Sequence, residues 1–100
     1  MIALQAIVGF DWDAGNARKS VDKHGVSEAE AEQVFFGKPL LLLEDERHSG
    51  TELRFHALGQ TAEGRRLHFA FTLRGNEKLI RVISARDMSR KERDVYEQAS

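Results

Sequence analysis

The sequence predicts an α+β fold in a single domain spanning residues 1–100, with helices packed on one face of a mostly antiparallel meander sheet. Three observations support this fold class. The chain of 100 residues contains no repeat, linker or low-complexity stretch, so one compact unit is expected. Helix signals gather between residues 13 and 37, and apolar residues then alternate with polar ones as far as residue 86.

The first segment of the chain is apolar but short. Residues 1–8 lack the basic start of a signal peptide and are too few to cross a membrane, so we expect a first strand or an ordered arm there. Cysteine is absent, which rules out disulfides and thiolate ligands and favours a cytoplasmic protein.

Two helices are predicted next, and together they would form an N-terminal helical hairpin. Asp13 can cap a helix over residues 14–23, and Gly25 can supply a left-handed stop. Ser27 and Glu30 match a capping box that opens the second helix, which Gly37 and Pro39 end. The buried face of this second helix should consist of Ala31, Val34 and Phe35.

Four apolar or alternating runs then predict antiparallel strands, and a second capping box opens a last helix. The strands are expected at Leu40–Leu43, Glu52–Gly59, Arg65–Leu73 and Leu79–Arg86. The acidic residues 44–46 should end the first of them, and Gly75-Asn76 marks the last hairpin. Ser89 and Glu92 form the second capping box, and the helix should run to about Gln98.

Strand periodicity sorts the side chains of the sheet onto two faces. The buried face should hold Leu53, Phe55, Leu67, Phe69, Phe71, Ile80 and Val82. The opposite face should hold Glu52, Arg54, His56, Arg66, His68, Thr72, Arg74 and Arg81. Arg86 has the core parity of Val82 and Ser84, so it would join the polar face only if the strand end twisted outward.

The segment 81–97 is basic and allows two interpretations. The net charge of −1 combines −5 over residues 1–46 with +4 over residues 47–100. Strand arginines followed by Arg90, Lys91 and Arg93 suit phosphate contacts, because guanidinium groups bind phosphate oxygens in pairs. The alternative is a salt-bridged core strand followed by an ordinary charged surface helix.

The arginines, histidines and glutamate of the polar face are chemically sufficient to cleave RNA, with histidine or glutamate moving protons and arginine stabilising the phosphorane. The reaction needs a base for the ribose 2′-hydroxyl, positive charge at the phosphorane, and a proton for the leaving 5′-oxygen. The four histidines show no zinc-ligand spacing, so neither a metal nor another cofactor is expected. Lys23-His24-Gly25 could contribute proton-transfer groups or could be a simple helix stop, and Trp12 is expected to anchor the core.

Three groups of residues resemble the BrnT-type toxins. The first is Phe10-Asp11-Trp12-Asp13 with Gly15-Asn16, Lys19, residues 23–27 and Glu30-Ala31. The second comprises residues 57–61, Gly64-Arg65, Phe71-Thr72 and Arg74-Gly75, and the third comprises residues 81–86, residues 90–93 and Tyr96. Ser20 departs from the family, which often has asparagine there. The resemblance implies a RelE-like ribonuclease, the toxin of a type II toxin–antitoxin module.

The resemblance also implies which residues would form the site. It points to Lys23, His24, Glu52, Arg54, Arg81 and Ser84 as catalytic residues. Arg54 and Arg81 would stabilise transition-state charge, and Lys23, His24 or Glu52 would move protons, with base and acid unassigned. The flanking RNA would be held by Arg74, Arg86, Arg90 and Lys91.

The expected partners are an RNA substrate and a ribbon-helix-helix antitoxin of BrnA type, with operator DNA bound through the complex. No membrane is expected, and the chain alone could form a homodimer. Two other functions are open: a catalytically degenerate toxin that binds an antitoxin and assists repression, and a simple RNA-binding domain. The RNA-binding domain is disfavoured because the phenylalanines point into the core and leave no stacking platform on the polar face.

Overall fold

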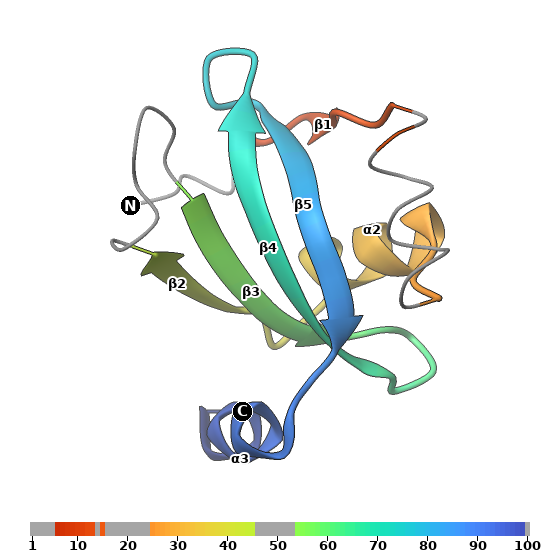
Figure 1. The fold of residues 1–100 in the computed structure, drawn as a ribbon, viewed down its shortest axis with the longest axis vertical. Coiled ribbons are helices and arrows are strands. Elements are labelled where there is room, and N and C mark those ends of the chain that lie inside the picture. The colour runs from red at the N-terminus through yellow and green to blue at the C-terminus, as the bar shows by residue number, and fades with distance from the viewer. Residues whose placement is uncertain (1–5, 14, 16–24, 46–53, 100) are drawn as a thin grey trace.

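The computed structural model describes residues 6–13, 15, 25–45 and 54–99, and these form one five-stranded sheet with two helices (Figure 1). The strands are β1 (Gly9–Phe10), β2 (Leu41–Asp45), β3 (Arg54–Gln60), β4 (Arg66–Arg74) and β5 (Leu79–Asp87). The helices are α2 (Glu28–Phe36) and α3 (Arg90–Ala99). The order of strands across the sheet is β1-β5-β4-β3-β2.

The sheet is mixed, so the expected meander needs correction. Strands β2 to β5 pair antiparallel in chain order, but β1 pairs parallel with β5 through Gly9↔Leu79 and Phe10↔Ile80. The expected N-terminal helical hairpin is not matched either. The described helix between β1 and β2 is α2, and the helix predicted over residues 14–23 lies outside the described residues except for Gly15. The apolar N-terminal segment pairs with the edge of β5, and Ile7 and Phe10 pack there against the core.

The predicted capping box of α2 is confirmed. The Ser27 hydroxyl accepts a hydrogen bond from the Glu30 amide at 3.1 Å, and the Ser27 amide donates to the Glu30 carboxylate at 3.0 Å. The expected face of Ala31, Val34 and Phe35 is buried against the sheet. The ring of Phe35 lies 5.3 Å from that of Phe69 and 5.0 Å from that of Phe71, between ring centroids.

The predicted core parity of β3, β4 and the first half of β5 is also confirmed. The core beneath α2 includes the expected Phe55, Leu67, Phe69, Phe71, Ile80 and Val82, joined by Ala57 and Ala85. Leu53 lies outside the described residues. Trp12 packs against this core as expected, since its ring stacks on Phe10 with centroids 5.6 Å apart.

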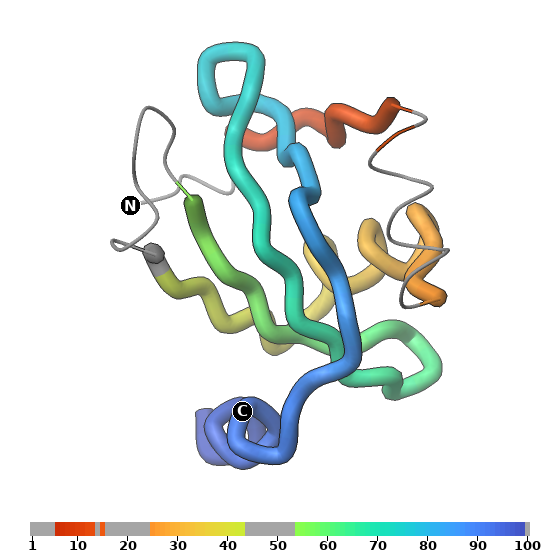
Figure 2. The backbone as a smooth tube through the Cα atoms, in the orientation of Figure 1, coloured from red at the N-terminus to blue at the C-terminus, as the bar shows by residue number. Residues whose placement is uncertain are grey.

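Helix α3 lies on the opposite side of the sheet from α2, although both were expected on one face. Leu58 follows the core residue Ala57 and therefore points away from α2, where it packs with Met88 and Tyr96. The Tyr96 hydroxyl donates to the carbonyl of Pro39 at 2.7 Å. Figure 2 shows α3 at one end of the sheet, well separated from α2. An apolar leucine that points away from the main core is stabilised when other apolar side chains shield it from water, and α3 supplies them.

Strand β2 differs from its predicted form because it occupies the edge of the sheet. It was expected to span Leu40–Leu43 and to end at the acidic residues 44–46, but backbone pairing with β3 continues through Asp45↔Arg54. Leu43 is 51% exposed. An edge strand has only one neighbour to cover it, so an apolar run there need not be buried.

A β-bulge at Ile83 reverses the side-chain parity in the second half of β5. Ala70 pairs with Ser84 and Phe71 pairs with Val82, which leaves Ile83 as the extra residue. Ala85 consequently joins the core, and Ser84 and Arg86 face the polar side. The expectation that Arg86 shares the parity of Val82 is therefore wrong.

Candidate functional site

The sheet face opposite α2 divides into two halves. At the end near the β4–β5 turn, which we call the open half, Arg54, Thr72 and Arg81 form a row across three strands. Thr72 pairs with Arg81, and the register Phe55↔Phe71 puts Arg54 on the other side of Thr72. We call the remainder, where α3 packs, the covered half.

Arg81 is held by two carboxylates from the segment after β1. Its guanidinium lies 2.7 Å from an Asp13 carboxylate oxygen and 3.5 Å from one of Asp11. The hydrogen bond to Asp13 is the largest cause of a raised Arg81 pKa, with desolvation opposing it. Phe10 pairs with Ile80 and the two strands run parallel, so the next residues, Asp11 and Arg81, lie side by side. The arginine is thus fixed in position before any ligand binds.

The next row of the face contains His56, Ala70 and Ser84. His56 pairs with Ala70, and Ala70 pairs with Ser84. Residues two apart on a strand are separated by about 7 Å, so this row lies within one side-chain length of the arginine row. The Ile83 bulge is what brings Ser84 onto this face.

The covered half is organised by an ion pair between β5 and α3. The Arg86 guanidinium donates two hydrogen bonds to the Glu92 carboxylate, at 2.8 and 2.9 Å. Glu92 also completes the predicted capping box, which is confirmed: it accepts from the Ser89 amide at 2.9 Å and donates its own amide to the Ser89 hydroxyl at 3.2 Å. Chiefly through the Arg86 hydrogen bonds, and despite desolvation, the pKa of Glu92 falls to about 2.

His68 lies between the two halves and is nearly buried, with 8% of its surface exposed. Its Nε2 is 2.9 Å from Nδ1 of His56 and 4.0 Å from a Glu92 oxygen. Burial, followed by the charge of Arg86, lowers the pKa of His68 to about 4. His68 is therefore neutral at physiological pH. Its Nδ1 is buried without a hydrogen-bond partner among the residues described.

The structure brings together some of the predicted site residues and separates others. Arg54, Arg81 and Ser84 share the open half, and Arg74 ends β4 beyond them. Arg86 is bound to Glu92, while Arg90 and Lys91 are exposed in the first turn of α3. The predicted Lys23, His24 and Glu52 lie outside the described residues.

The contact between His56 and His68 is the feature that sequence reasoning missed. Both were expected on the polar face, but neither was counted in the site. Their contact is diagonal: His56 pairs with Ala70, and His68 with Leu58. Only the exact register of the β3–β4 hairpin brings these two rings together, and periodicity alone does not supply that register.

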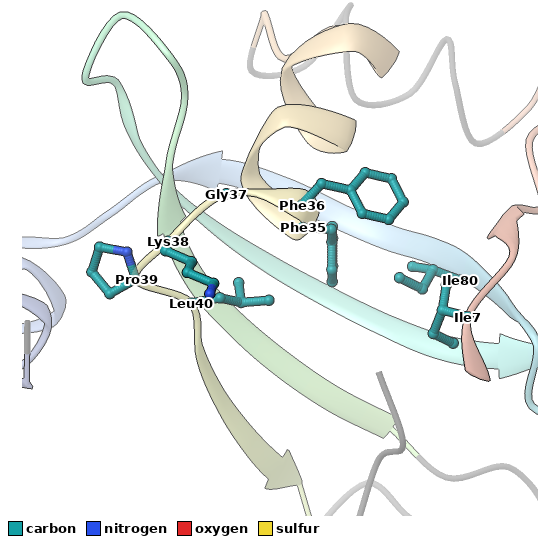
Figure 3. Close-up of a pocket in the computed structure, with 8 residues that line it drawn as sticks. All are labelled: Ile7, Phe35, Phe36, Gly37, Lys38, Pro39, Leu40 and Ile80. Atoms are coloured by element: carbon teal, nitrogen blue, oxygen red, sulfur yellow. The ribbon is translucent and has the colours of Figure 1, made fainter. Parts of the chain in front are cut away.

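An apolar pocket of about 760 Å³ lies away from this face, between the end of α2 and the start of β5 (Figure 3). Its lining includes Phe35, Phe36, Leu40, Ile7 and Ile80. Phe36 is 66% exposed beside it. The charged groups of the sheet face do not line this pocket, so it is not part of the candidate site.

No helix among the described residues is long and apolar enough to cross a membrane.

No curated protein matches the chain. A family model described as the ribonuclease toxin BrnT of type II toxin–antitoxin systems matches residues 12–92, which include Arg54, Arg81 and the whole sheet from β2 to β5. The chain therefore belongs to the BrnT family of ribonuclease toxins, whose type II systems pair a toxin with an antitoxin.

Proposed function

We propose that this chain is a RelE-like, metal-independent endoribonuclease that cleaves RNA in the cytoplasm and so inhibits translation and growth. The observation that carries the proposal is the row of Arg54, Thr72 and Arg81 on the open half of the sheet. Thr72 between them is buried, so the two guanidinium groups are the members of the row that can receive a phosphodiester from both sides. Membership in a family of ribonuclease toxins supports the same reaction.

In the proposed reaction the ribose 2′-oxygen attacks the adjacent phosphorus. The new 2′-O–P bond forms while the P–O5′ bond breaks, which gives a 2′,3′-cyclic phosphate and a 5′-hydroxyl. Arg54 and Arg81 stabilise the negative charge that accumulates on the non-bridging oxygens. Asp11 and Asp13 hold Arg81 in place, so little reorganisation is needed when that charge develops.

Proton transfer in this proposal involves Lys23, His24 or Glu52. Ser84, which lies on the same sheet face as the arginine row, would contact the substrate. Arg74, Arg90 and Lys91 would hold RNA on either side of the cut. Arg86 would contribute through the field around the site, since its hydrogen bonds are directed at Glu92.

The proposed partner is a ribbon-helix-helix antitoxin of BrnA type that neutralises the toxin and binds operator DNA in the complex. In the absence of antitoxin, a homodimer of the chain is the proposed state. Gel filtration with light scattering, on the chain alone and after addition of the product of the adjacent reading frame, measures both assemblies.

A second function is favoured by one specific observation. Both Arg81 and Arg86 already form ion pairs with carboxylates of the same chain. A toxin whose cationic groups were fully neutralised in this way could persist as a non-enzymatic module that binds the antitoxin and assists repression.

Induced expression of the chain, with and without substitutions, separates the two functions. We expect growth arrest by the wild type, and relief of the arrest by Arg54→Ala or Arg81→Ala. Lys38→Ala, which removes an exposed cation beside the apolar pocket, should still arrest growth. Protein from cell-free synthesis should cleave RNA in EDTA, and either arginine substitution should slow cleavage about 100-fold. An absence of cleavage with tight antitoxin binding would establish the non-enzymatic module instead.

A further inference from the structure

The apolar pocket between α2 and β5 is a feature that the proposed cleavage mechanism leaves unused. Figure 3 shows Phe35 directed into a space with Leu40 at one end and Ile7 and Ile80 at the other. The volume of about 760 Å³ lies within the range of about 300–1,000 Å³ that is typical of ligand pockets. Apolar side chains of another molecule would stabilise such a pocket by displacing water from its walls.

Exposed apolar side chains adjoin the same pocket. Phe36 is 66% exposed in its lining, and Val8, which follows the lining residue Ile7, is 75% exposed. These are the two most exposed large apolar side chains among the residues described. Apolar and aromatic side chains gathered around a pocket are typical of the central part of a protein–protein interface. The composition of the pocket therefore favours a protein as its occupant.

The wall of the pocket formed by residues 37–40 is held in place by hydrogen bonds within the chain. The amide of Gly37 donates to the carbonyl of Val34 at the end of α2, at 3.3 Å. The carbonyl of Pro39 accepts the 2.7 Å hydrogen bond from Tyr96 on α3. A wall that is ordered before binding loses little conformational entropy when a partner arrives. The pocket is thus prepared to receive a partner without rearrangement.

Lys38 gives one end of the pocket a positive charge. It lines the pocket at the end where Leu40 lies, as Figure 3 shows, and it is exposed. Its amino group has no carboxylate partner among the residues described. The other described lining residues carry no charge. An occupant that complements this surface therefore presents apolar side chains with a carboxylate next to them.

We infer that this pocket anchors the antitoxin, through a segment that inserts apolar side chains between α2 and β5 and directs a carboxylate to Lys38. The inference rests on the proposed antitoxin partner and does not depend on RNA cleavage. RNA fits this pocket poorly, because one cation in the described lining cannot hold successive phosphates. The lining residues Phe35 and Ile80 belong to the core on the α2 side of the sheet, whereas the arginine row lies on the opposite face. Antitoxin binding and RNA cleavage therefore use different surfaces.

Isothermal titration of the full chain with the purified product of the adjacent reading frame tests the inference. Phe36→Ser should raise the Kd about 30-fold, because an aromatic anchor is lost. Val95→Ser, which changes an exposed apolar residue of α3 on the other side of the sheet, is the matched control and should stay within about threefold of wild type. Thermal unfolding of each variant checks that the fold is retained.

Substitutions of Lys38 test the charge complementarity, and its exposure means that they leave the core untouched. Lys38→Glu should raise the Kd about 10-fold, because two carboxylates would then face each other. Lys38→Arg keeps the charge and should stay within about threefold of wild type. An unchanged Kd in either Phe36→Ser or Lys38→Glu would overturn the inference and leave the proposed cleavage intact. A wild type that does not bind the product at all would also overturn it.

Hydrogen exchange of the backbone amides locates the partner without any substitution. In the complex, protection should increase at residues 6–10 and 36–40, and an increase confined to the open half of the opposite face would overturn the inference. Equal protection of residues 6–10 and 36–40 in the chain alone would also overturn it. The occupant would then be a second copy if the protection depended on concentration, and a segment of the same chain if it did not. A wild type that binds the antitoxin but cleaves no RNA would refute the proposed function and leave this inference standing.

Discussion

Replacement of Glu92 by glutamine should destabilise the protein strongly at neutral pH and weakly in acid. The carboxylate of Glu92 accepts two hydrogen bonds from Arg86 and one from the Ser89 amide at the start of α3. It therefore joins β5 to α3 and caps the helix at the same time. Glutamine preserves the size of the side chain but removes the charge, so the ion pair is lost while the packing is kept.

The size of this effect follows from the shift in the pKa. Folding lowers the pKa of Glu92 from 4.5 to about 2, and at about 1.4 kcal/mol per pKa unit the ionised carboxylate stabilises the fold by up to ~3 kcal/mol. The folded pKa is the lower one, so this stability is fully present above pH 4.5 and is lost as the pH falls toward 2. At pH 3 about 1.4 kcal/mol should remain, and at pH 2 less than about 0.5 kcal/mol.

Urea unfolding followed by circular dichroism, between pH 3 and pH 7, measures this difference. The free energy of unfolding of Glu92→Gln should approach that of the wild type as the pH falls. Glu63→Gln, an exposed carboxylate in the β3–β4 turn, is the matched control and should change stability by less than about 0.5 kcal/mol. An equal difference at pH 3 and pH 7, or none at either, would refute the assignment of the shift to the Arg86 pair.

Three further predictions test other parts of the fold by urea or thermal unfolding. His68 takes up its proton only near pH 4 in the folded state, so the free energy of unfolding of the wild type should fall by up to ~3 kcal/mol between pH 6.5 and pH 4. The free energy of unfolding of His68→Leu should fall much less, and parallel curves of stability against pH for the two proteins would contradict this. Tyr96→Phe removes a buried hydrogen bond and should cost about 1 kcal/mol, whereas an unchanged Tm would mean that the bond contributes nothing. A Cβ at Gly59 would lie 2.7 Å from a methyl carbon of Val34, so Gly59→Ala should cost about 1–3 kcal/mol, while Gly9→Ala, with its nearest atom at 3.7 Å, should be tolerated. Equal effects of the two alanines would show that the close approach at Gly59 is relieved by movement of the helix.

Local sequence signals predicted the individual elements well. The two capping boxes, at Ser27 and Ser89, have the predicted partners and open the predicted helices. The alternation of apolar residues in β3 and β4 gave the correct buried face, because a period of two residues is a direct property of strand geometry. The β4–β5 turn is confirmed at Gly75 and Asn76, both of which have a φ of 58°.

Features that depend on contacts between distant segments could not be predicted in the same way. The parallel pairing of β1 with β5 joins residues about seventy positions apart, and no local pattern distinguishes it from an ordered arm. The position of α3 on the face opposite α2 had one overlooked signal, the apolar Leu58 at an outward position. The charged row at the candidate site was predicted in part, since Arg54 and Arg81 follow from parity alone.

The bulge at Ile83 shows why the site itself needed three-dimensional information. An uninterrupted β5 would have pointed Arg86 into the core with Val82, where a guanidinium without a partner is costly. One extra residue turns Arg86 toward Glu92 and Ser84 toward the open half, while Ala85 fills the core instead. Arg86 thus connects α3 to the sheet, and its charge also helps to lower the pKa of His68. The arginines on the two sides of the bulge consequently have different roles, because Arg81 before it faces the proposed cleavage site and Arg86 after it supports the helix and the histidine pair.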